Sequence, residues 1–518
     1  MFSEQLHKSV YFGALILLAV SLPFSVFTLS VAQIVLLVNW ILEGRFRQKW
    51  ELIIKQPSLW MIGIFYLVHI LWMINTSNIA WGLHELKINL PLLVIPLVIA
   101  TSSPLGKDQL KIILSSFVVA VLVFSLYSGY LIFGFDGKPF HTMEELSPII
   151  WHIRWALMAD VAVFLIAWLL LNVNITLVRI FYVTAGLWLI VYLFLFKSLT
   201  GIVVLVVTAA IMLLWFALRQ KQLMLKWFTI TGFLTLVLVI ATYLTHAYAR
   251  FSAFEKIDFT KLDKYTAQGN PYWNDTTRTY VENGHYEFIY ICDKELRESW
   301  KQRSKMDLDG KTKDGGELKY ALVRYLTSKG LRKDAQGVDQ LTDREIRYIE
   351  AGKTNYIDTN KYALYPRLYI SMLELYQYTH GANPTGYSLS QRIEYLKTSF
   401  HIIKDNFWFG IGTGDVPNAF ERQYIIDKSQ LAKNSQWWAT NQLVTFFVNF
   451  GLIGFLITLF SLLSPPYFER KYSNYLFLII FIIGFLSFLD EDTFETHPGI
   501  SMFAFFYSLF LYYKDEKT

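Results

Sequence analysis

Residues 202–218 read IVVLVVTAAIMLLWFAL, a run without a charged side chain. A helix of about 17–25 mainly apolar residues spans the hydrocarbon core of a bilayer, and this run has the required length. Eleven further mainly apolar runs occur at residues 10–26, 28–42, 57–74, 88–102, 112–133, 155–172, 181–196, 228–246, 441–463, 475–489 and 500–513. Together the runs predict an all-α polytopic membrane protein with about 12 transmembrane helices.

The distribution of charge supports this class. Only 17% of the 518 residues are charged, whereas soluble domains carry about 25%. Of the 47 Lys and Arg residues, 28 lie between Arg250 and Lys433, so the segments on either side are very poor in charge. This distribution excludes a soluble cytosolic enzyme, a disordered chain and a fibre. The single cysteine, Cys292, excludes an intramolecular disulfide and a cysteine-based zinc site.

The basic residues of the short loops predict the topology. With the N-terminus inside, the cytoplasmic pieces carry 15 Lys and Arg residues, and the short outer loops and span borders carry Lys87, Lys138, Arg154 and Lys197. Because basic residues favour the cytoplasmic side, both termini are predicted to be cytoplasmic. The same bias accounts for the net charge of +6 without a nucleic-acid partner. The predicted domains are nine spans in residues 1–246, a large, mainly helical outer loop at 247–440, and three spans with a short tail at 441–518.

Basic residues also gather at the predicted outer face. Lys87 opens the fourth span, His152 and Arg154 open the sixth, and Lys197 closes the seventh. Such a set suits a lipid-linked pyrophosphate, which arginine binds through two parallel hydrogen bonds and lysine attracts as a point charge. Taken singly, each residue also suits an anchor that reaches the lipid headgroups. Asp160, inside the sixth span, either pairs with a neighbour or lines a wet cavity.

Two motifs near the end of the large loop are more specific. Arg392 precedes a Gly-x-Gly-x-Gly turn at Gly410–Gly414, and Thr440-Asn441 precedes Gly451-x-x-Gly454 by nine residues. This arrangement resembles the O-antigen ligase and O-antigen polymerase superfamily. Its ligases carry a His-Asn pair, nine residues and Gly-x-x-Gly at the junction between loop and membrane, with an arginine upstream of a Gly-x-Gly-x-Gly turn.

Other segments add to the resemblance. Lys87–Pro96 resembles a basic-leucine-proline span entry of the family, and Ser198–Gly201 resembles its Ser-Arg-Thr-Gly. Glu282–Gly284 and Tyr325–Lys329 resemble stretches of Bacteroidetes-type members. The resemblance covers most of the chain in architecture and is concentrated in residues 390–455 by motif.

The chain departs from the family pattern at two positions. Thr440 stands where ligases carry the loop histidine, and Leu199 stands where they carry an arginine. A threonine cannot act as a general base near neutral pH. Lys197, or the His152 and Arg154 pair, is a candidate source of the missing positive charge. The departures weaken the assignment as a ligase more than the assignment to the superfamily, and they leave an inactive or divergent chain open.

The resemblance implies a glycosyltransferase of lipopolysaccharide biosynthesis in the bacterial inner membrane. Such an enzyme moves a glycan from an undecaprenyl-pyrophosphate carrier to an acceptor hydroxyl, such as that of lipid A-core, at the periplasmic face. The implied reaction inverts the sugar and uses no cofactor and no metal, and no His, Asp or Glu cluster has convincing metal-ligand spacing. The implied partners are the lipid-linked glycan, the glycan acceptor and the lipid bilayer.

The predicted site follows from this chemistry. A pyrophosphate leaving group gains charge as its bond to the sugar breaks, so cations around it stabilise the transition state. The predicted cations are Arg392, Arg154, Lys197 and Lys87, with His152 beside them. Only Arg392 is matched by motif; the others rest on depth and charge.

The predicted general base is His401, followed by Asp415 and Glu394 in order of preference. His401 also reads as an ordinary helix residue, and Asp415 as a cap for the segment that follows the glycine turn. The three glycines favour a tight turn over a phosphate cradle, because a bare Gly-x-Gly-x-Gly is a weak signal.

Several alternatives stay open at this stage. A repeat-unit polymerase uses similar chemistry on a different acceptor, and so does a ligase for protein glycans or teichoic-type polymers. A membrane protein that only binds the lipid-linked glycan would need no base. A transporter is less well supported, because its polar groups would lie near the bilayer midplane, often with inverted repeats, and the chain has no internal repeat.

Overall fold

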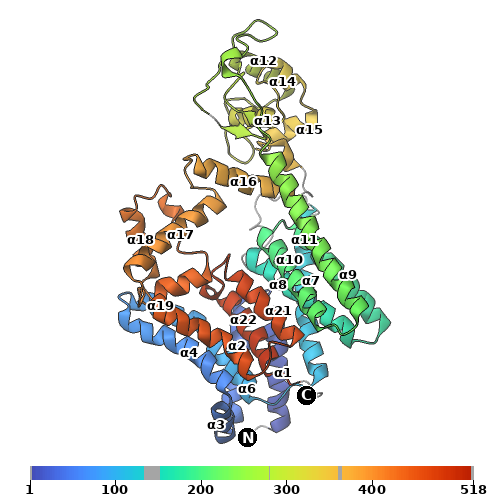
Figure 1. The fold of residues 1–518 in the computed structure, drawn as a ribbon, viewed down its shortest axis with the longest axis vertical. Helices are drawn as coiled ribbons and strands as arrows, with labels where there is room; N and C mark the ends of the chain where they lie inside the picture. The colour runs from blue at the N-terminus through green and yellow to red at the C-terminus, as the bar shows by residue number, and fades with distance from the viewer. Residues whose placement is uncertain (1–2, 134–151, 279, 360–363, 515–518) are drawn as a thin grey trace. The chain divides into compact units, whose positions relative to one another are not determined.

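A computed structural model describes residues 3–133, 152–278, 280–359 and 364–514 and consists mainly of helices (Figure 1). Within these ranges the only strands are β1 (Val281–Glu282) and β2 (His285–Tyr286), which pair as an antiparallel hairpin. Lys138, counted above among the outer basic residues, lies outside the described residues. The structure agrees with an all-α polytopic membrane protein.

Nine helical segments of the described chain are long and apolar enough to cross a membrane. They are α2 (Val26–Glu43), α4 (Pro57–Leu71) with η1 (Trp72–Asn75), α5 (Ile79–Asn89) with α6 (Pro91–Thr101), α7 (Lys107–Ile132), α8 (His152–Asn172), α9 (Thr176–Leu195), α10 (Leu199–Arg219), α11 (Leu223–Phe251), and α19 (Gln442–Leu463) with α20 (Pro465–Phe468). The other three predicted runs also form helices, α1 (Glu4–Ser21), α21 (Tyr475–Ser487) and α22 (His497–Tyr512). The count of twelve spans stays a prediction.

The fourth run begins earlier than its apolar pattern indicates. Asn78 caps α5 by accepting a hydrogen bond from Trp81 N, and Pro91 starts α6 at a position where its missing N–H is not needed. Lys87 therefore lies in the second half of α5, with a further two turns of helix before it.

The chain divides into two compact units, residues Met1–Lys226 with Asn383–Thr518 (unit 1) and Trp227–Ala382 (unit 2). Residues 383–440, predicted as part of the large loop, are thus grouped with the membrane helices, and α11 with unit 2. The units follow contacts between residues, whereas the predicted domain boundaries follow the membrane. Those boundaries stay a prediction.

Unit 1 is built around α22. Its residues from Gly499 to Leu511 are buried on all sides of the helix, as expected for a helix at the centre of a bundle. It packs against α6 and α21; elsewhere in the unit α1 packs on α2, and α4 lies beside α19 (Figure 1). Its remaining helices are α3 (Phe46–Lys55), α17 (Ser388–Asp405), α18 (Val416–Ile426), η4 (Lys433–Ser435) and η5 (Thr493–Glu495).

Unit 2 combines α11 with a set of short elements. They are η2 (Phe259–Lys261), the β1–β2 hairpin, α12 (Asp293–Arg303), α13 (Leu318–Ser328), α14 (Ala335–Asp339), α15 (Asp343–Glu350), η3 (Tyr356–Thr359) and α16 (Tyr365–Thr379). Leu296, Trp300, Leu322 and Ile349 form the centre of its apolar core.

Candidate functional site

A short acidic segment connects α21 to α22 in unit 1. It comprises residues 490–495 (Asp490-Glu491-Asp492-Thr493-Phe494-Glu495) and carries four carboxylates. The start of α19 holds it in place, because Gln442 N donates to Phe488 O at 2.9 Å and Phe494 N donates to Gln442 Oε1 at 2.7 Å. Side chains from α5, α8, α10, α17 and α19 also contact it. Elements far apart in the sequence therefore meet at this segment.

Two arginines from different helices converge on Glu491. Arg392, on α17, donates from Nη1 to Asp490 Oδ1 at 2.5 Å and from Nη2 to Glu491 Oε1 at 3.2 Å. Arg154, near the start of α8, places Nη2 3.6 Å from Glu491 Oε2. The two oxygens of one carboxylate thus face two guanidinium groups. The structure brings together two of the four cations predicted from the sequence.

This cluster is largely shielded from solvent. The side chain of Glu491 is 10% exposed, that of Arg154 15% and that of Arg392 22%. Burial raises the pKa of Glu491 above its ordinary value, although Arg154 and Arg392 oppose the shift. The buried Nε of Arg154 makes no hydrogen bond. The guanidinium group of Arg154 therefore has a donor that a second anion can use.

The other carboxylates of the segment are also buried. Asp492 accepts a hydrogen bond from Thr445 Oγ1 at 2.9 Å, and burial raises its pKa well above the usual range. Glu495 is hydrogen-bonded to Glu85 of α5 and to Gln442 Nε2, and burial raises its pKa as well. A hydrogen bond between two carboxyl groups needs a proton on one of them. The site therefore carries less negative charge than its composition suggests.

The remaining predicted basic residues lie around this cluster in different ways. Lys197 occupies the turn between α9 and α10 with a left-handed φ of 53°, and Thr200, three residues later, donates to Asp490 Oδ2. The segment Ser198–Gly201 is thus anchored to the acidic segment. Lys87 is close enough to His497, at the start of α22, to interact with it electrostatically. His152 is the first residue of α8.

A kink in α19 explains the glycines of the junction motif. Gly451 has a φ of 60°, which interrupts the helix and frees backbone groups on both sides. The loop at 407–412 satisfies them: Leu452 N donates to Phe407 O at 2.8 Å, and Gly412 N donates to Asn449 O at 2.9 Å. An unsatisfied backbone group costs several kcal/mol in a membrane, so kink and loop depend on each other.

The same contact requires glycine on both sides. A Cβ atom added to Gly410 would lie 2.4 Å from Asn449 O, and one added to Gly451 would lie 2.4 Å from Phe409 N. At Gly454 an added Cβ would lie 2.7 Å from the Trp72 ring. In this structure the glycines serve close backbone packing.

Asp415 and His401, the predicted bases, have partners away from the acidic segment. The Asp415 carboxylate accepts hydrogen bonds from Ser77 N, Ser77 Oγ and Asn78 N, each at 2.8 Å, and so fixes the start of α5. His401 Nδ1 lies 3.0 Å from Asp427, and its ring is 57% exposed. His401 follows Arg392 by nine residues on α17, which is about half a turn away from it around the helix. Glu394, third in the predicted order, pairs with Lys397 at 3.0 Å.

The departure at Thr440 lies directly beside the site. Thr440 is half-buried and precedes Asn441, which caps α19 by accepting a hydrogen bond from Val444 N at 3.1 Å. Asn441 Nδ2 also donates to Leu489 O at 2.9 Å. The junction motif therefore helps to hold the acidic segment, together with the contacts from α5, α8, α10 and α17.

The sequence predictions missed the acidic segment itself. A usable signal was present, because four carboxylates within six residues separate two apolar runs at the predicted outer face, where charge is costly. Among the described residues, no group of three or more His, Cys, Asp or Glu side chains has the geometry of a metal site.

A family model described as O-Antigen ligase matches residues 359–459. The matched stretch includes Arg392, the glycine turn and the kinked junction at Gly451, and it confirms the resemblance drawn from these motifs. No curated protein matches the chain. Together with the nine long apolar helices, the match identifies a multi-pass membrane protein.

Proposed function

We propose that this chain, a member of the O-antigen ligase superfamily, moves a glycan from an undecaprenyl-pyrophosphate carrier to an acceptor hydroxyl at the periplasmic face of the inner membrane. The family is one of ligase- and polymerase-like membrane glycosyltransferases, whose substrates are lipid-linked glycans and glycan acceptors. The observation that carries the proposal is the convergence of Arg154 and Arg392 on Glu491.

In this proposal Glu491 occupies the place of the pyrophosphate before the donor binds. The donor's phosphate oxygens take over the guanidinium donors, including Arg154 Nε, which has no partner at present. Arginine matches phosphate geometry through parallel hydrogen bonds. As the bond between the sugar and the pyrophosphate breaks, the fixed positive charges stabilise the growing negative charge. The arginines, Lys87 and Lys197 supply this charge in a reaction without metal or cofactor.

The same exchange prepares Glu491 to act as the general base. Burial already raises the pKa of Glu491, while the two arginines hold it down. When the pyrophosphate engages the arginines, that opposing effect weakens and the pKa of Glu491 rises further. A carboxylate with a raised pKa accepts a proton from the acceptor hydroxyl more readily than an ordinary one. Thr440 offers no such chemistry, and His401 and Asp415 rank below Glu491 because each pairs elsewhere.

The stereochemistry and topology of the proposal follow the sequence predictions. Once the pyrophosphate displaces Glu491 from the arginines, the Glu491 carboxylate turns to the acceptor hydroxyl on the opposite face of the sugar, and attack from that face inverts the sugar. We propose that both termini lie in the cytoplasm and that the acidic segment and the large loop at residues 247–440 lie in the periplasm. The preferred acceptor is lipid A-core. A repeat-unit polymerase is the second candidate, and the threonine at position 440 is the observation that favours it.

The test is a gene deletion followed by electrophoresis of surface glycolipid. Lipid A-core without long glycan, together with accumulated lipid-linked polymer, is the result expected for a ligase. Core carrying a single repeat unit would indicate the polymerase. An unchanged pattern would overturn both and favour a protein that binds or transports the lipid-linked glycan. Complementation with the double variant Arg154→Ala, Arg392→Ala is expected to fail, whereas Arg344→Gln, an exposed change on α15, restores the wild-type pattern.

A further inference from the structure

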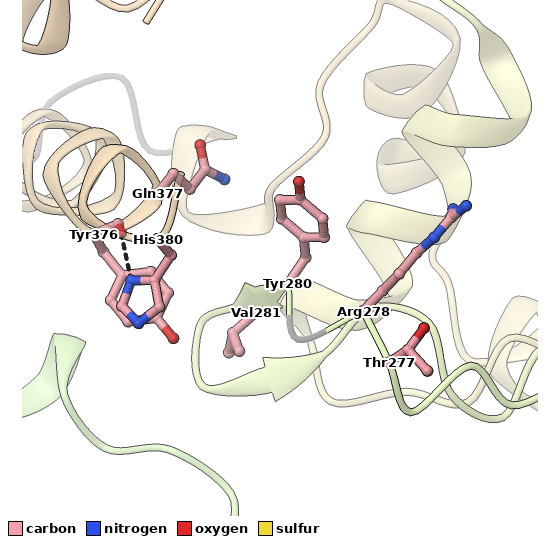
Figure 2. A pocket seen from close by; sticks show the side chains of 7 residues that line it. All are labelled: Thr277, Arg278, Tyr280, Val281, Tyr376, Gln377 and His380. Atoms are coloured by element: carbon pink, nitrogen blue, oxygen red, sulfur yellow. Dashed lines mark hydrogen bonds between the residues drawn. The ribbon is translucent and has the colours of Figure 1, made fainter. Parts of the chain in front are cut away.

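A cleft within unit 2 lies between α16 and the segment that leads into the β1–β2 hairpin. Its volume is about 230 Å³, and it is lined by Thr277, Arg278, Tyr280, Val281, Tyr376, Gln377 and His380. Figure 2 shows Tyr376 and Gln377 of α16, with His380 directly after the helix, across the cleft from Arg278, Tyr280 and Val281. The mechanism proposed above uses none of these residues.

Aromatic rings on both sides of the cleft are held in fixed positions. Tyr280 is 47% exposed and packs edge-on against Phe288, with ring centroids 5.9 Å apart. On the other side, the His380 ring lies 4.1 Å from that of Tyr376 at 33°, and its Nδ1 donates a hydrogen bond to the Tyr376 carbonyl oxygen, 2.7 Å away. Aromatic faces carry partial negative charge, so they attract the C–H groups on the face of a sugar ring.

The polar groups of the cleft are suited to hydroxyl and anionic groups. Gln377 Oε1 is buried and has no hydrogen-bond partner, and a buried acceptor of this kind is costly unless a donor reaches it. The side chain of Arg278 is 58% exposed, and its Nε forms an ion pair with Asp275 at 3.3 Å. Among the described residues that line the cleft, Arg278 and His380 are the ionisable groups other than tyrosine, and none is a carboxylate.

We propose that this cleft binds an anionic saccharide, with a sugar ring on Tyr280, a hydroxyl donating to Gln377 Oε1 and the anionic group beside Arg278. The choice of saccharide rests on the proposed function: the phosphorylated acceptor glycan is the ligand that it would supply to unit 2. Exposed tyrosines also suit a lipid interface, and the experiment separates the two.

The test uses the full chain in detergent and isothermal titration. The probe is the phosphorylated core oligosaccharide released from lipopolysaccharide by removal of its acyl chains. We expect Tyr280→Ala, Gln377→Leu and Arg278→Gln each to weaken binding about tenfold, which corresponds to the loss of about 1.4 kcal/mol. Tyr280→Phe, which keeps the ring, is expected to bind like the wild type. After enzymatic dephosphorylation of the probe, Arg278→Gln should make no further difference.

Two matched changes in unit 2 serve as controls. Tyr265, which is 63% exposed, and Arg344 on α15 lie outside the cleft. Tyr265→Ala and Arg344→Gln should leave the affinity unchanged. If all cleft variants bind the probe with the affinity of the wild type, the inference is overturned. It is also overturned if the protein binds empty phosphatidylglycerol vesicles through Tyr280 and does not bind the probe.

The outcome is separable from that of the proposed function. Arg392→Ala is expected to abolish transfer and to leave binding of the probe intact. If transfer depends on Arg392 but the cleft variants bind normally, the inference fails alone. If the wild type binds the probe through Tyr280 but transfers no glycan, the proposed function fails and the saccharide site stands.

Discussion

Each unit contains a buried arginine that faces a buried glutamate, and the two pairs differ in how completely they are satisfied. In unit 2, Arg324 Nη2 and Nε both donate to Glu282 Oε2, at 2.8 and 3.1 Å, while Asn355 Nδ2 donates to Glu282 Oε1 at 2.6 Å. In unit 1, Arg154 approaches Glu491 only to 3.6 Å and leaves Nε without a partner.

The difference indicates two roles for the same residue types. Glu282 is 3% exposed, and its interactions leave no free oxygen for a ligand, so this pair stabilises unit 2. The Arg154–Glu491 contact is long, and Glu491 is shared with Arg392. Another anion can therefore displace Glu491 from Arg154 at low cost. A buried pair that is incompletely hydrogen-bonded contributes little to stability, and a site that must exchange its anion needs such a pair.

The largest effect is expected from Glu491→Gln. Removal of a general base slows transfer by about 10²–10⁴-fold. The base must be ionised, so in the wild type kcat/KM rises with pH through the pKa of Glu491, which lies above the ordinary 4.5. The measurement is the pH profile of glycan transfer by purified protein. Glu491→Asp keeps a carboxylate, so its rate should still rise with pH at the acidic end of the profile. A profile of Glu491→Gln that matches the wild type in rate and shape would remove Glu491 from the mechanism.

Arg324→Ala should be the most damaging of the arginine changes to folding. It leaves Glu282 buried without its cation, which costs about 3–5 kcal/mol. Thermal unfolding of the full chain, followed by circular dichroism, should show a lower midpoint. If Arg154→Ala lowers the unfolding midpoint as much as Arg324→Ala does, the two pairs do not differ in their contribution to stability.

Arg154→Ala is expected to act on transfer instead. The loss of one positive group that faces the developing charge slows transfer by about 10²–10³-fold, while the unfolding midpoint stays close to that of the wild type. Arg154→Lys keeps the charge but not the paired hydrogen bonds, and it should recover only part of the rate. Unchanged transfer by Arg154→Ala together with Arg392→Ala would end the proposal of a cation clamp.

The contrast also shows which parts of this molecule can be predicted from sequence. The predicted spans fall on helices because an apolar run in a bilayer must satisfy its backbone internally, a requirement that each run carries within itself. Arg392 was predicted from the family motif, and Arg154 was predicted from its position at the outer end of an apolar run. Glu491 was missed because a carboxylate in a connecting loop normally faces water, and nothing local to residues 488–496 records that α8 and α17 cover it.

The same limit explains the predicted bases. His401 and Asp415 have suitable chemistry, but their partners, Asp427 and the α5 N-terminus, are set by packing between helices. The family resemblance pointed to residues 390–455, which include Arg392, and not to the pairs that Arg392 makes with distant residues. Pairing between distant residues is the information that the structure added.

The smallest predicted effect concerns an unsatisfied carboxylate in unit 2. Glu287 is 4% exposed, and its Oε1 is buried without a hydrogen-bond partner. Burial raises its pKa from 4.5 to about 7. A raised pKa means that the folded state holds the proton more tightly than the unfolded state between these values. Stability from this group is therefore fully present below pH 4.5 and is lost as the pH rises to about 7.

Glu287→Gln should remove this dependence and stabilise the chain by about 1–3 kcal/mol at pH 8, because the amide needs no deprotonation in the buried site. The measurement is the unfolding midpoint at pH 5 and pH 8. The variant should gain at pH 8 and differ little from the wild type at pH 5, where Glu287 is mostly protonated in the folded state. Burial lowers the pKa of the neighbouring Lys333 to about 8. Because both proteins carry this lysine, the effect of Glu287 is taken as the difference between variant and wild type at each pH. An equal gain at both pH values would mean that packing, and not protonation of Glu287, sets the stability of this site. The contrast between Glu491, which gives way to a bound anion in unit 1, and a carboxylate that is only buried in unit 2 would then rest on the two arginine–glutamate pairs alone.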